Sequence, residues 1–210
     1  MRDARAEYAK APRLPEGEEV ELSQFLPGHQ PLELEIGPGR GMFILERAVA
    51  APETRLLGME IKRKWSTIVD GRLREKGFAE RARVVCEDAK LALPRLRPDG
   101  GIARIFVHFP DPWWKKRHHK RMVLGDALVE EIVRLLCDGG ELYVQTDVPD
   151  RAERFETLLL HALLDPAGDE PGSPLLARNP YGARSNREKR ADLDGLPVCR
   201  LRYRRRPRTP

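Results

Sequence analysis

The chain has 210 residues, of which 40% are hydrophobic and 34% are charged, and its formal net charge is +5. This length and composition allow one substantial domain with a real core and argue against two. No apolar stretch approaches the roughly 18–20 residues that a membrane-spanning helix needs, and the first residues lack the apolar core of a signal peptide. We therefore expect a cytoplasmic protein, with an extended lead-in over 1–30 and a single domain over 31–210.

After residue 30, apolar runs of strand length alternate with amphipathic stretches of helix length. Strands are predicted over 32–36, 55–60, 83–86, 102–109, 141–146 and 198–203. Helices are predicted over 41–51, 64–76, 90–96, 124–137 and 151–164, with a loop rich in Pro, Gly and Ser over 165–182. This alternation indicates βαβ units, so the predicted fold class is α/β and Rossmann-like, a mostly parallel central sheet with helices on both faces.

A glycine-rich loop, Glu35-Ile36-Gly37-Pro38-Gly39-Arg40-Gly41, follows the first predicted strand. Glycines there let the backbone turn tightly and approach a ligand. A dinucleotide site favours Gly-x-Gly-x-x-Gly and a P-loop ends in Gly-Lys-Ser/Thr, so neither pattern fits. The loop resembles instead the first motif of the S-adenosylmethionine-dependent methyltransferases. That resemblance would place Glu35 near the amino-acid end of the cofactor, with Gly37 and Gly39 making room.

Acidic residues also follow the next two predicted strands. Glu60 closes the second strand about 20 residues past the loop, where a carboxylate can accept both ribose hydroxyls of a nucleoside. Asp88 follows the third strand and is placed to meet an adenine ring. Three acids at successive strand ends favour an S-adenosylmethionine site over a nicotinamide site or a purely structural turn.

The segment after the fourth predicted strand is the most informative in the chain. Phe109-Pro110-Asp111-Pro112-Trp113-Trp114 precedes the run 115–121, which carries five positive charges and no acid. The prolines hold the backbone around the acid, the tryptophans offer stacking faces, and the cations suit phosphates. With the six arginines of 200–208, this favours a polyanion partner, for which RNA, DNA and an acidic membrane are candidates. The alternative is a hydrophobic plug beside a solvated charge run.

Metal and disulfide chemistry are not expected. His118 and His119 have no acid or cysteine at ligand spacing, so phosphate contact is the favoured interpretation. Cys86, Cys137 and Cys199 are far apart, which argues against a disulfide framework or a zinc ribbon and for a reducing compartment. Cys86 ends an apolar run and is predicted to be a buried small hydrophobe.

The Phe-Pro-Asp-Pro-Trp string with its basic run resembles the signature of the bacterial tRNA (guanine-N(7)-)-methyltransferases, the TrmB family. Further family motifs match at Leu34–Gly37, Gly58–Glu60 and Thr146-Asp147, so the resemblance covers about residues 32–150 in matching order. It implies a methyltransferase that moves a methyl group from S-adenosylmethionine to nitrogen 7 of a variable-loop guanosine in tRNA. No membrane and no obligate protein partner are expected, and the chain would be a monomer or a homodimer.

The resemblance also implies roles for individual residues. The cofactor pocket would be lined by Glu35, Gly37, Gly39, Glu60, Asp88 and Asp111, and Asp111 would also be the catalytic residue. The substrate would be bound by Lys115, Asp147, Ser185 and Glu188, with 180–210 as the C-terminal substrate segment. The RNA would be bound in a basic loop, 113–122, by Arg117, His118, His119, Lys120 and Arg121. Ser185 replaces the Thr of the family's Thr-x-x-Glu motif, and Arg151 and Ala191 replace a usual Tyr and Gly.

Guanine nitrogen 7 carries an in-plane lone pair and no proton, so its methylation needs alignment rather than a general base. A carboxylate can stabilise the cationic product, which suggests positioning and electrostatics as the role of Asp111. Two alternatives stay open. One is methylation of an exocyclic amine, because Pro110–Trp113 distantly resembles the Asp/Asn-Pro-Pro-Tyr turn of enzymes that catalyse this reaction. The other is a catalytically inactive RNA-binding module that keeps the fold.

Overall fold

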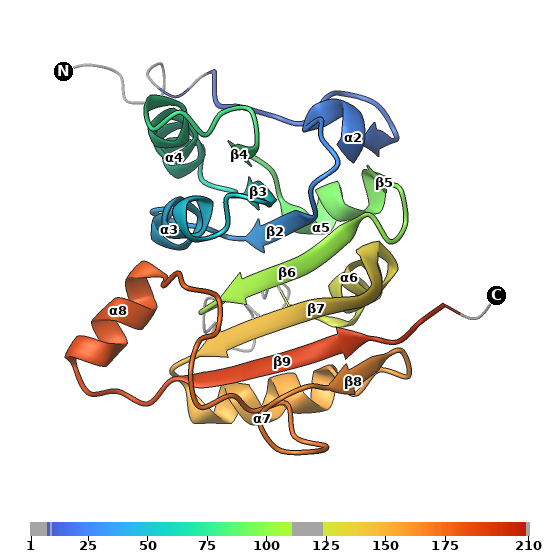
Figure 1. Cartoon of the computed structure of the whole chain (residues 1–210), viewed down its shortest axis with the longest axis vertical. Coiled ribbons are helices and arrows are strands. Elements are labelled where there is room, and N and C mark those ends of the chain that lie inside the picture. The colour runs from blue at the N-terminus through green and yellow to red at the C-terminus, as the bar shows by residue number, and fades with distance from the viewer. Residues whose placement is uncertain (1–7, 9, 111–123, 209–210) are drawn as a thin grey trace, which may run out of the picture.

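The predicted alternation of strands and helices is present as a seven-stranded, mostly parallel sheet (Figure 1). The computed structural model describes residues 8, 10–110 and 124–208. Its strands are β1 Val20–Glu21, β2 Leu32–Ile36, β3 Arg55–Met59, β4 Ala82–Val85, β5 Leu96–Arg97, β6 Ile102–His108, β7 Leu136–Thr146, β8 Leu164–Pro166 and β9 Cys199–Arg205. Its helices are α2 Leu22–Phe25, α3 Met42–Ala50, α4 Arg63–Glu75, α5 Ala89–Ala92, the 3-10 turn η1 Leu93–Arg95, α6 Asp126–Leu135, α7 Pro149–Leu158 and α8 Asn186–Leu193.

The strand order, β4-β3-β2-β6-β7-β9-β8, places the first long strand in the interior of the sheet. β2 pairs in parallel with β3 on one side and with β6 on the other. The chain therefore builds outward from β2 to β4 and then returns to β6 on the opposite side. Open α/β sheets bind ligands beyond the carboxyl ends of their strands at such a reversal.

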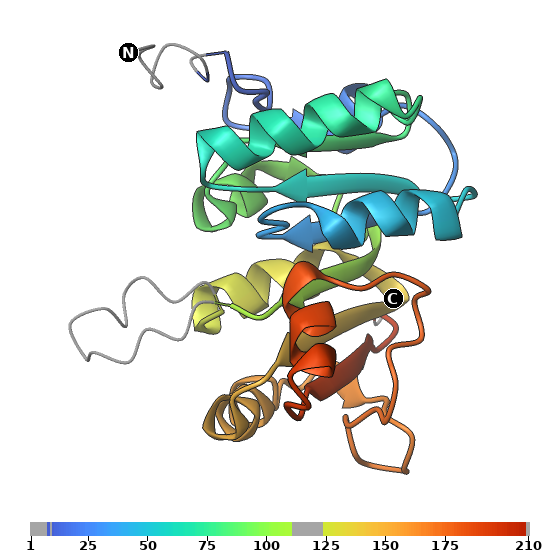
Figure 2. The ribbon, with the colours of Figure 1, turned by 90° about the vertical axis from the view of Figure 1, so that its left-hand side faces the viewer.

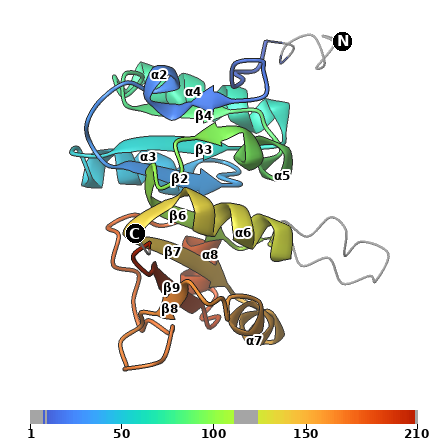
Figure 3. The same ribbon diagram turned by 90° about the vertical axis from the view of Figure 1, so that its right-hand side faces the viewer.

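The two faces of the sheet differ in chemistry. One face carries apolar side chains such as Leu34, Val107 and Val144, and α5, α6 and α7 pack on it to form the main core (Figure 3). The other face carries α3 and α4, with α8 nearby (Figure 2). On that second face a smaller aromatic cluster, built around Phe43 and Phe106, joins the 176–183 segment to the sheet. Helices therefore cover both faces, as the sequence predicts.

Several elements differ from the sequence-based expectation. The expected lead-in is not simply extended: β1 pairs with β5, and Val20, Leu22 and Leu26 are each only 2% exposed, because these apolar side chains complete the core. α8 lies in a stretch with no predicted element, where only two side chains are buried. The closing strand β9 is antiparallel to β7 and lies between β7 and β8. α8 leaves no apolar pattern because it buries little, whereas the pairing of β1 and the direction of β9 depend on strands far away in the sequence.

Two further expectations concern the cysteines and membrane-spanning helices. Cys86 is buried directly after β4, as predicted, and all three cysteines are free thiols. Within the described residues, no helix combines the length and the apolar character that crossing a bilayer requires.

Candidate functional site

The loop between β2 and α3 is open at two glycines and tightly packed at the third. Gly37 and Gly39 have φ values of 73° and 54°, and a Cβ added at either would meet no described atom within 4 Å. Gly41 also has a positive φ, of 75°, but a Cβ there would lie 2.3 Å from Cγ1 of Val69 in α4. The first two glycines therefore leave space above the backbone, and the third lets α3 and α4 approach each other.

Glu60 ties this loop to the start of α4. Its Oε2 accepts a hydrogen bond from the backbone N–H of Gly39 at 2.9 Å, and its Oε1 accepts one from the N–H of Lys62 at 2.8 Å. The residue is only 5% exposed. A carboxylate offers about four lone-pair sites, so two remain for a further donor. Glu60 therefore fixes the loop and still has the capacity to accept ligand hydroxyls.

Glu35 forms a buried pair with a residue that sequence reasoning missed, His108 at the end of β6. Nδ1 of His108 lies 2.9 Å from Oε1 of Glu35, and since a carboxylate only accepts, the ring donates. The ring packs 4.2 Å from that of Phe43, between centroids. Among the described residues, Oε2 of Glu35 and Nε2 of His108 are buried without a hydrogen-bond partner. An unpaired buried carboxylate oxygen is costly, so Glu35 suits a ligand that brings a cationic donor.

The acids predicted at the strand ends lie at one edge because the strands end level with one another. Ile36 pairs with Met59, and Met59 pairs with Val85. Asp88 follows as the N-cap of α5, with its Oδ1 accepting from the N–H of Lys90 at 3.0 Å. Two carboxylates with lone pairs to spare and an open backbone loop thus share one edge of the sheet, an arrangement that fits the ammonium and hydroxyl donors of S-adenosylmethionine.

The chain leaves β6 through a strained turn. Phe109 has a φ of 46°, a left-handed conformation that costs roughly 1–2 kcal/mol in a residue with a Cβ. Such outliers cluster at functional sites. The turn is held by a hydrogen bond from the N–H of Phe109 to the carbonyl of Gln145 at 2.8 Å. The predicted residues that come next lie outside the described residues: Asp111, Lys115, Arg117, His118, His119, Lys120 and Arg121.

The predicted substrate residues of the C-terminal half lie close to one another in space. Asp147, just after β7, accepts from Nε of Arg187 in α8 at 2.6 Å. Ser185 caps α8, since its Oγ accepts from the N–H of Glu188 at 3.1 Å. Glu188 is 1% exposed. The structure therefore connects Asp147 to the same helix that carries Ser185 and Glu188.

The carboxylate of Glu188 is held by two residues that the motif does not include. Arg200 of β9 donates to Oε1 at 3.1 and 3.2 Å, and Nδ2 of Asn179 donates to Oε2 at 2.9 Å. All three line a cavity of about 550 Å³ between α3, α8 and the 177–184 segment. Glu188 therefore lies at the wall of a cavity with its carboxylate oriented from both sides.

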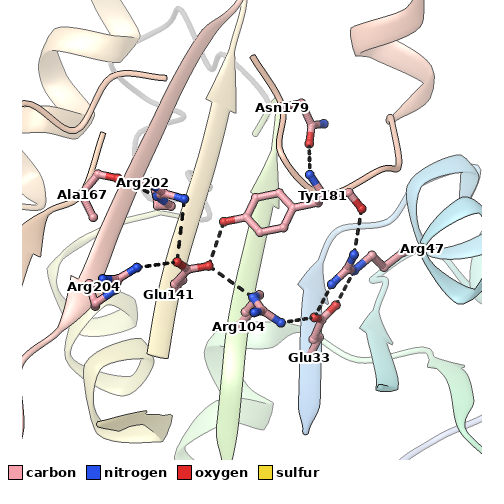
Figure 4. Close-up of polar contacts among 9 residues, drawn as sticks. All are labelled: Glu33, Arg47, Arg104, Glu141, Ala167, Asn179, Tyr181, Arg202 and Arg204. Carbon is pink, nitrogen blue, oxygen red and sulfur yellow. Dashed lines mark hydrogen bonds and ion pairs between the residues drawn. The ribbon is translucent and has the colours of Figure 1, made fainter. Parts of the chain in front are cut away.

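A buried network of charged side chains fastens the 176–183 segment to the sheet (Figure 4). Arg47 of α3 donates to both oxygens of Glu33 at 2.8 and 2.7 Å, and to the carbonyl of Tyr181 at 2.8 Å. Arg104 bridges Glu33 and Glu141, and the Tyr181 hydroxyl donates to Glu141 at 3.2 Å. Burial, reinforced by the charge of Glu141, raises the pKa of Tyr181 well above its usual value, so the phenol keeps its proton. The glutamates at alternate positions of β2, Glu33 and Glu35, were the available sequence signal for this polar face.

The chain is similar to known proteins over most of its length, including the carboxyl ends of β2, β3 and β4. The Methyltransf_4 family of methyltransferases matches residues 29–189. A tRNA (guanine-N(7)-)-methyltransferase from Rhodopirellula baltica is 34% identical over 190 residues, which is 88% of this chain and 70% of the relative. One from Anaeromyxobacter dehalogenans is 40% identical over 171 residues, 81% of this chain and 84% of the relative. The structure of an rRNA methylase from Streptococcus thermophilus, 12% identical, aligns with a TM-score of 0.55 over 84% of this chain and 87% of that one, a likeness of fold alone.

Proposed function

The chain belongs to the Methyltransf_4 family, as a relative of the tRNA (guanine-N(7)-)-methyltransferases, and from this we propose that it methylates nitrogen 7 of a variable-loop guanosine in tRNA. The observation that carries the proposal is the edge formed by β2, β3 and β4. There, two glycines leave the backbone open, and Glu35, Glu60 and Asp88 lie at or just beyond the carboxyl ends of the three neighbouring strands.

S-adenosylmethionine, the methyl donor of the family, supplies a methyl group activated by a sulfonium centre. Oε2 of Glu35, buried and unpaired among the described residues, would accept from the ammonium group of the donor. Glu60 would accept from the ribose hydroxyls with the lone pairs that its two backbone hydrogen bonds leave over. Asp88 would accept from the adenine amine, and Gly37 and Gly39 would let the backbone lie against the ligand. These assignments use each side chain in the orientation that its present hydrogen bonds impose.

On the acceptor side, this chain needs to hold a guanine in line and need not remove a proton from it. We assign Asp111 to positioning the base and to stabilising the positive charge that develops on the purine. Lys115, Asp147, Ser185 and Glu188 are assigned to the guanosine. The carboxylate of Glu188 is pre-oriented for this role by Arg200 and Asn179. Arg117, His118, His119, Lys120 and Arg121 are assigned to RNA phosphates. A base in a helical stem exposes nitrogen 7 only in a deep groove, so a loop guanosine is the accessible substrate.

Product mapping tests the proposal directly. The protein is incubated with methyl-labelled S-adenosylmethionine and a tRNA transcript, and the modified nucleoside is identified by mass spectrometry. We expect 7-methylguanosine at one position of the variable loop, and no label in a matched transcript whose variable-loop guanosine is replaced by adenosine. Label on an exocyclic nitrogen would contradict the site assignment. A complete absence of label, with tRNA still bound, would favour an RNA-binding module.

His108 provides a separate test of the donor site. A His108→Leu variant is expected to bind S-adenosylhomocysteine about tenfold more weakly, because Glu35 loses the hydrogen bond that orients it and such bonds to charged groups are worth about 1.5–3 kcal/mol. His108→Asn keeps an N–H donor close to the position of Nδ1, so its affinity should stay within about threefold of wild type, a difference below 1 kcal/mol. Calorimetry measures both affinities, and thermal unfolding of the ligand-free variants monitors packing against Phe43. Equal affinities for the two variants would mean that the ring serves packing alone.

A further inference from the structure

A cluster of basic side chains lies beside the glycine loop, on the β3 side of the donor site. It consists of Arg40 in the loop together with Lys62, Arg63 and Lys64 at the start of α4. Arg40 and Lys64 lie against the ring of Trp65, so we call it the Trp65 surface. All four basic residues are exposed, and Trp65 is half-buried. None of them belongs to the basic run 115–121 or to the arginines of 200–208, so the sequence motifs leave this surface without a role.

The Trp65 surface is held in place by aromatic and carboxylate contacts. Cζ of Arg40 lies 5.4 Å from the centroid of the Trp65 ring, and Nζ of Lys64 lies 5.6 Å from it. Glu60 joins the two backbone segments that carry these cations, because it accepts from the N–H groups of Gly39 and Lys62. The charges are therefore gathered by the fold at one place, although Arg40 is more than twenty residues from the others.

Within the described part of the chain, the four cations lack the ion pairs that are common elsewhere in the molecule. No described carboxylate forms an ion pair with any of them, and Glu60 contacts this segment through the backbone N–H groups of Gly39 and Lys62. On the other side of the same edge, by contrast, Arg184, Arg187 and Arg190 each pair with an aspartate. The first turn of α4 contains no acid. Cations there oppose the positive end of the helix dipole, at roughly 0.3–1 kcal/mol each, so local stability does not explain them.

The position of the surface indicates its partner. The donor site lies above β2, with the Trp65 surface after β3 on one side and the end of β6 on the other. Neighbouring strands lie about 4.8 Å apart, so roughly 10 Å separates the ends of β3 and β6. An RNA strand that delivers a base to the donor site must continue past this edge. Unpaired cations held in a fixed group match the repeated phosphates of such a strand.

We propose that Arg40, Lys62, Arg63 and Lys64 form a second phosphate-binding surface for tRNA, on the β3 side of the donor site. This inference rests on the proposed function, because it takes tRNA to be the substrate. The surface contacts the backbone of the RNA and carries no base specificity. It holds the RNA that flanks the target guanosine from the side opposite to β6.

A pair of double variants on one helix tests the proposal. Lys62→Ala/Lys64→Ala removes two charges from the surface, and Arg72→Ala/Lys76→Ala removes two exposed charges, without a carboxylate partner among the described residues, near the other end of α4. We expect the first variant to bind tRNA about tenfold more weakly. The slope of log K against log salt should also be less steep by about two, because each lost phosphate contact reduces it by about 0.9. The second variant should match wild type in affinity and in slope. Filter binding over a salt series gives both quantities, and calorimetry with S-adenosylhomocysteine verifies that the donor site is intact.

The outcomes separate this inference from the proposed function. If the wild-type protein binds tRNA but forms no 7-methylguanosine, the function fails, while the comparison of the two double variants still tests the surface. Equal tRNA affinities and equal salt slopes for the two double variants would overturn the inference. So would a Lys62→Ala/Lys64→Ala protein that keeps full tRNA affinity but loses binding to phosphatidylserine vesicles, since the partner would then be a membrane.

Discussion

A Gly39→Ala variant is expected to bind S-adenosylhomocysteine at least about 100-fold more weakly than wild type, a loss of roughly 2.7 kcal/mol. A Cβ at Gly39 meets no described atom within 4 Å, so the methyl group would project into the open space that we assign to the donor. The N–H of Gly39 also donates to Glu60, which places this backbone beside the proposed ribose acceptor. The variant should lose only about 1–2 kcal/mol of stability, the strain of a left-handed alanine, so weak binding would not reflect unfolding.

The matched control is Gly71→Ala in the middle of α4. A Cβ added at Gly71 would likewise meet no described atom within 4 Å, but this glycine lies in a helix and away from the loop. Alanine there should stabilise the protein by about 0.5–1 kcal/mol and leave donor affinity unchanged. Isothermal calorimetry and urea unfolding measure the two effects. If Gly39→Ala bound S-adenosylhomocysteine as tightly as Gly71→Ala, the donor would not lie over this loop.

An Arg47→Met variant is expected to lose about 2–3 kcal/mol of unfolding free energy, less than the roughly 3–5 kcal/mol that follows when a buried charge is left without a partner, because Glu33 keeps its ion pair with Arg104. Arg47 and Glu33 are 8% and 1% exposed, so the carboxylate left behind has little access to water. The variant also loses the hydrogen bond from Arg47 to the carbonyl of Tyr181. We therefore expect faster proteolysis of the 176–183 segment along with the lower stability.

Arg190→Met is the matched control for this loss, because Arg190 pairs with Asp194 on the surface of α8 and its side chain is 67% exposed. Its removal should cost less than about 0.5 kcal/mol, as is usual for exposed pairs one helical turn apart. A Glu33→Gln/Arg47→Met double variant should lose less than the sum of the two single variants, since the two side chains interact directly. Similar losses for Arg47→Met and Arg190→Met would show that the buried network contributes no more than a surface pair.

Local sequence was sufficient to predict those features that depend on a few consecutive residues. The glycine loop after β2 was predictable because Gly-x-Gly-x-Gly after an apolar run restricts both backbone and ligand. The acids at Glu35, Glu60 and Asp88 were predictable as neighbours because parallel strands with helical crossovers end at one edge. Helix α8 was not predictable, because a helix that buries little apolar surface shows no periodic pattern of apolar residues in the sequence.

By itself, the sequence determined the α/β class, the parallel core of the sheet, the position of the glycine loop and the family. Only the tertiary structure decided which partner each charged or polar side chain meets: Glu35 with His108, Arg47 with Glu33, Glu188 with Arg200, and Arg40 with the ring of Trp65. It also decided that β9 is antiparallel and lies between β7 and β8. The physical reason is that the apolar periodicity of strands and helices is set by residues close together in the chain. The partner of a buried charge is set instead by the register of strands that are far apart in the sequence.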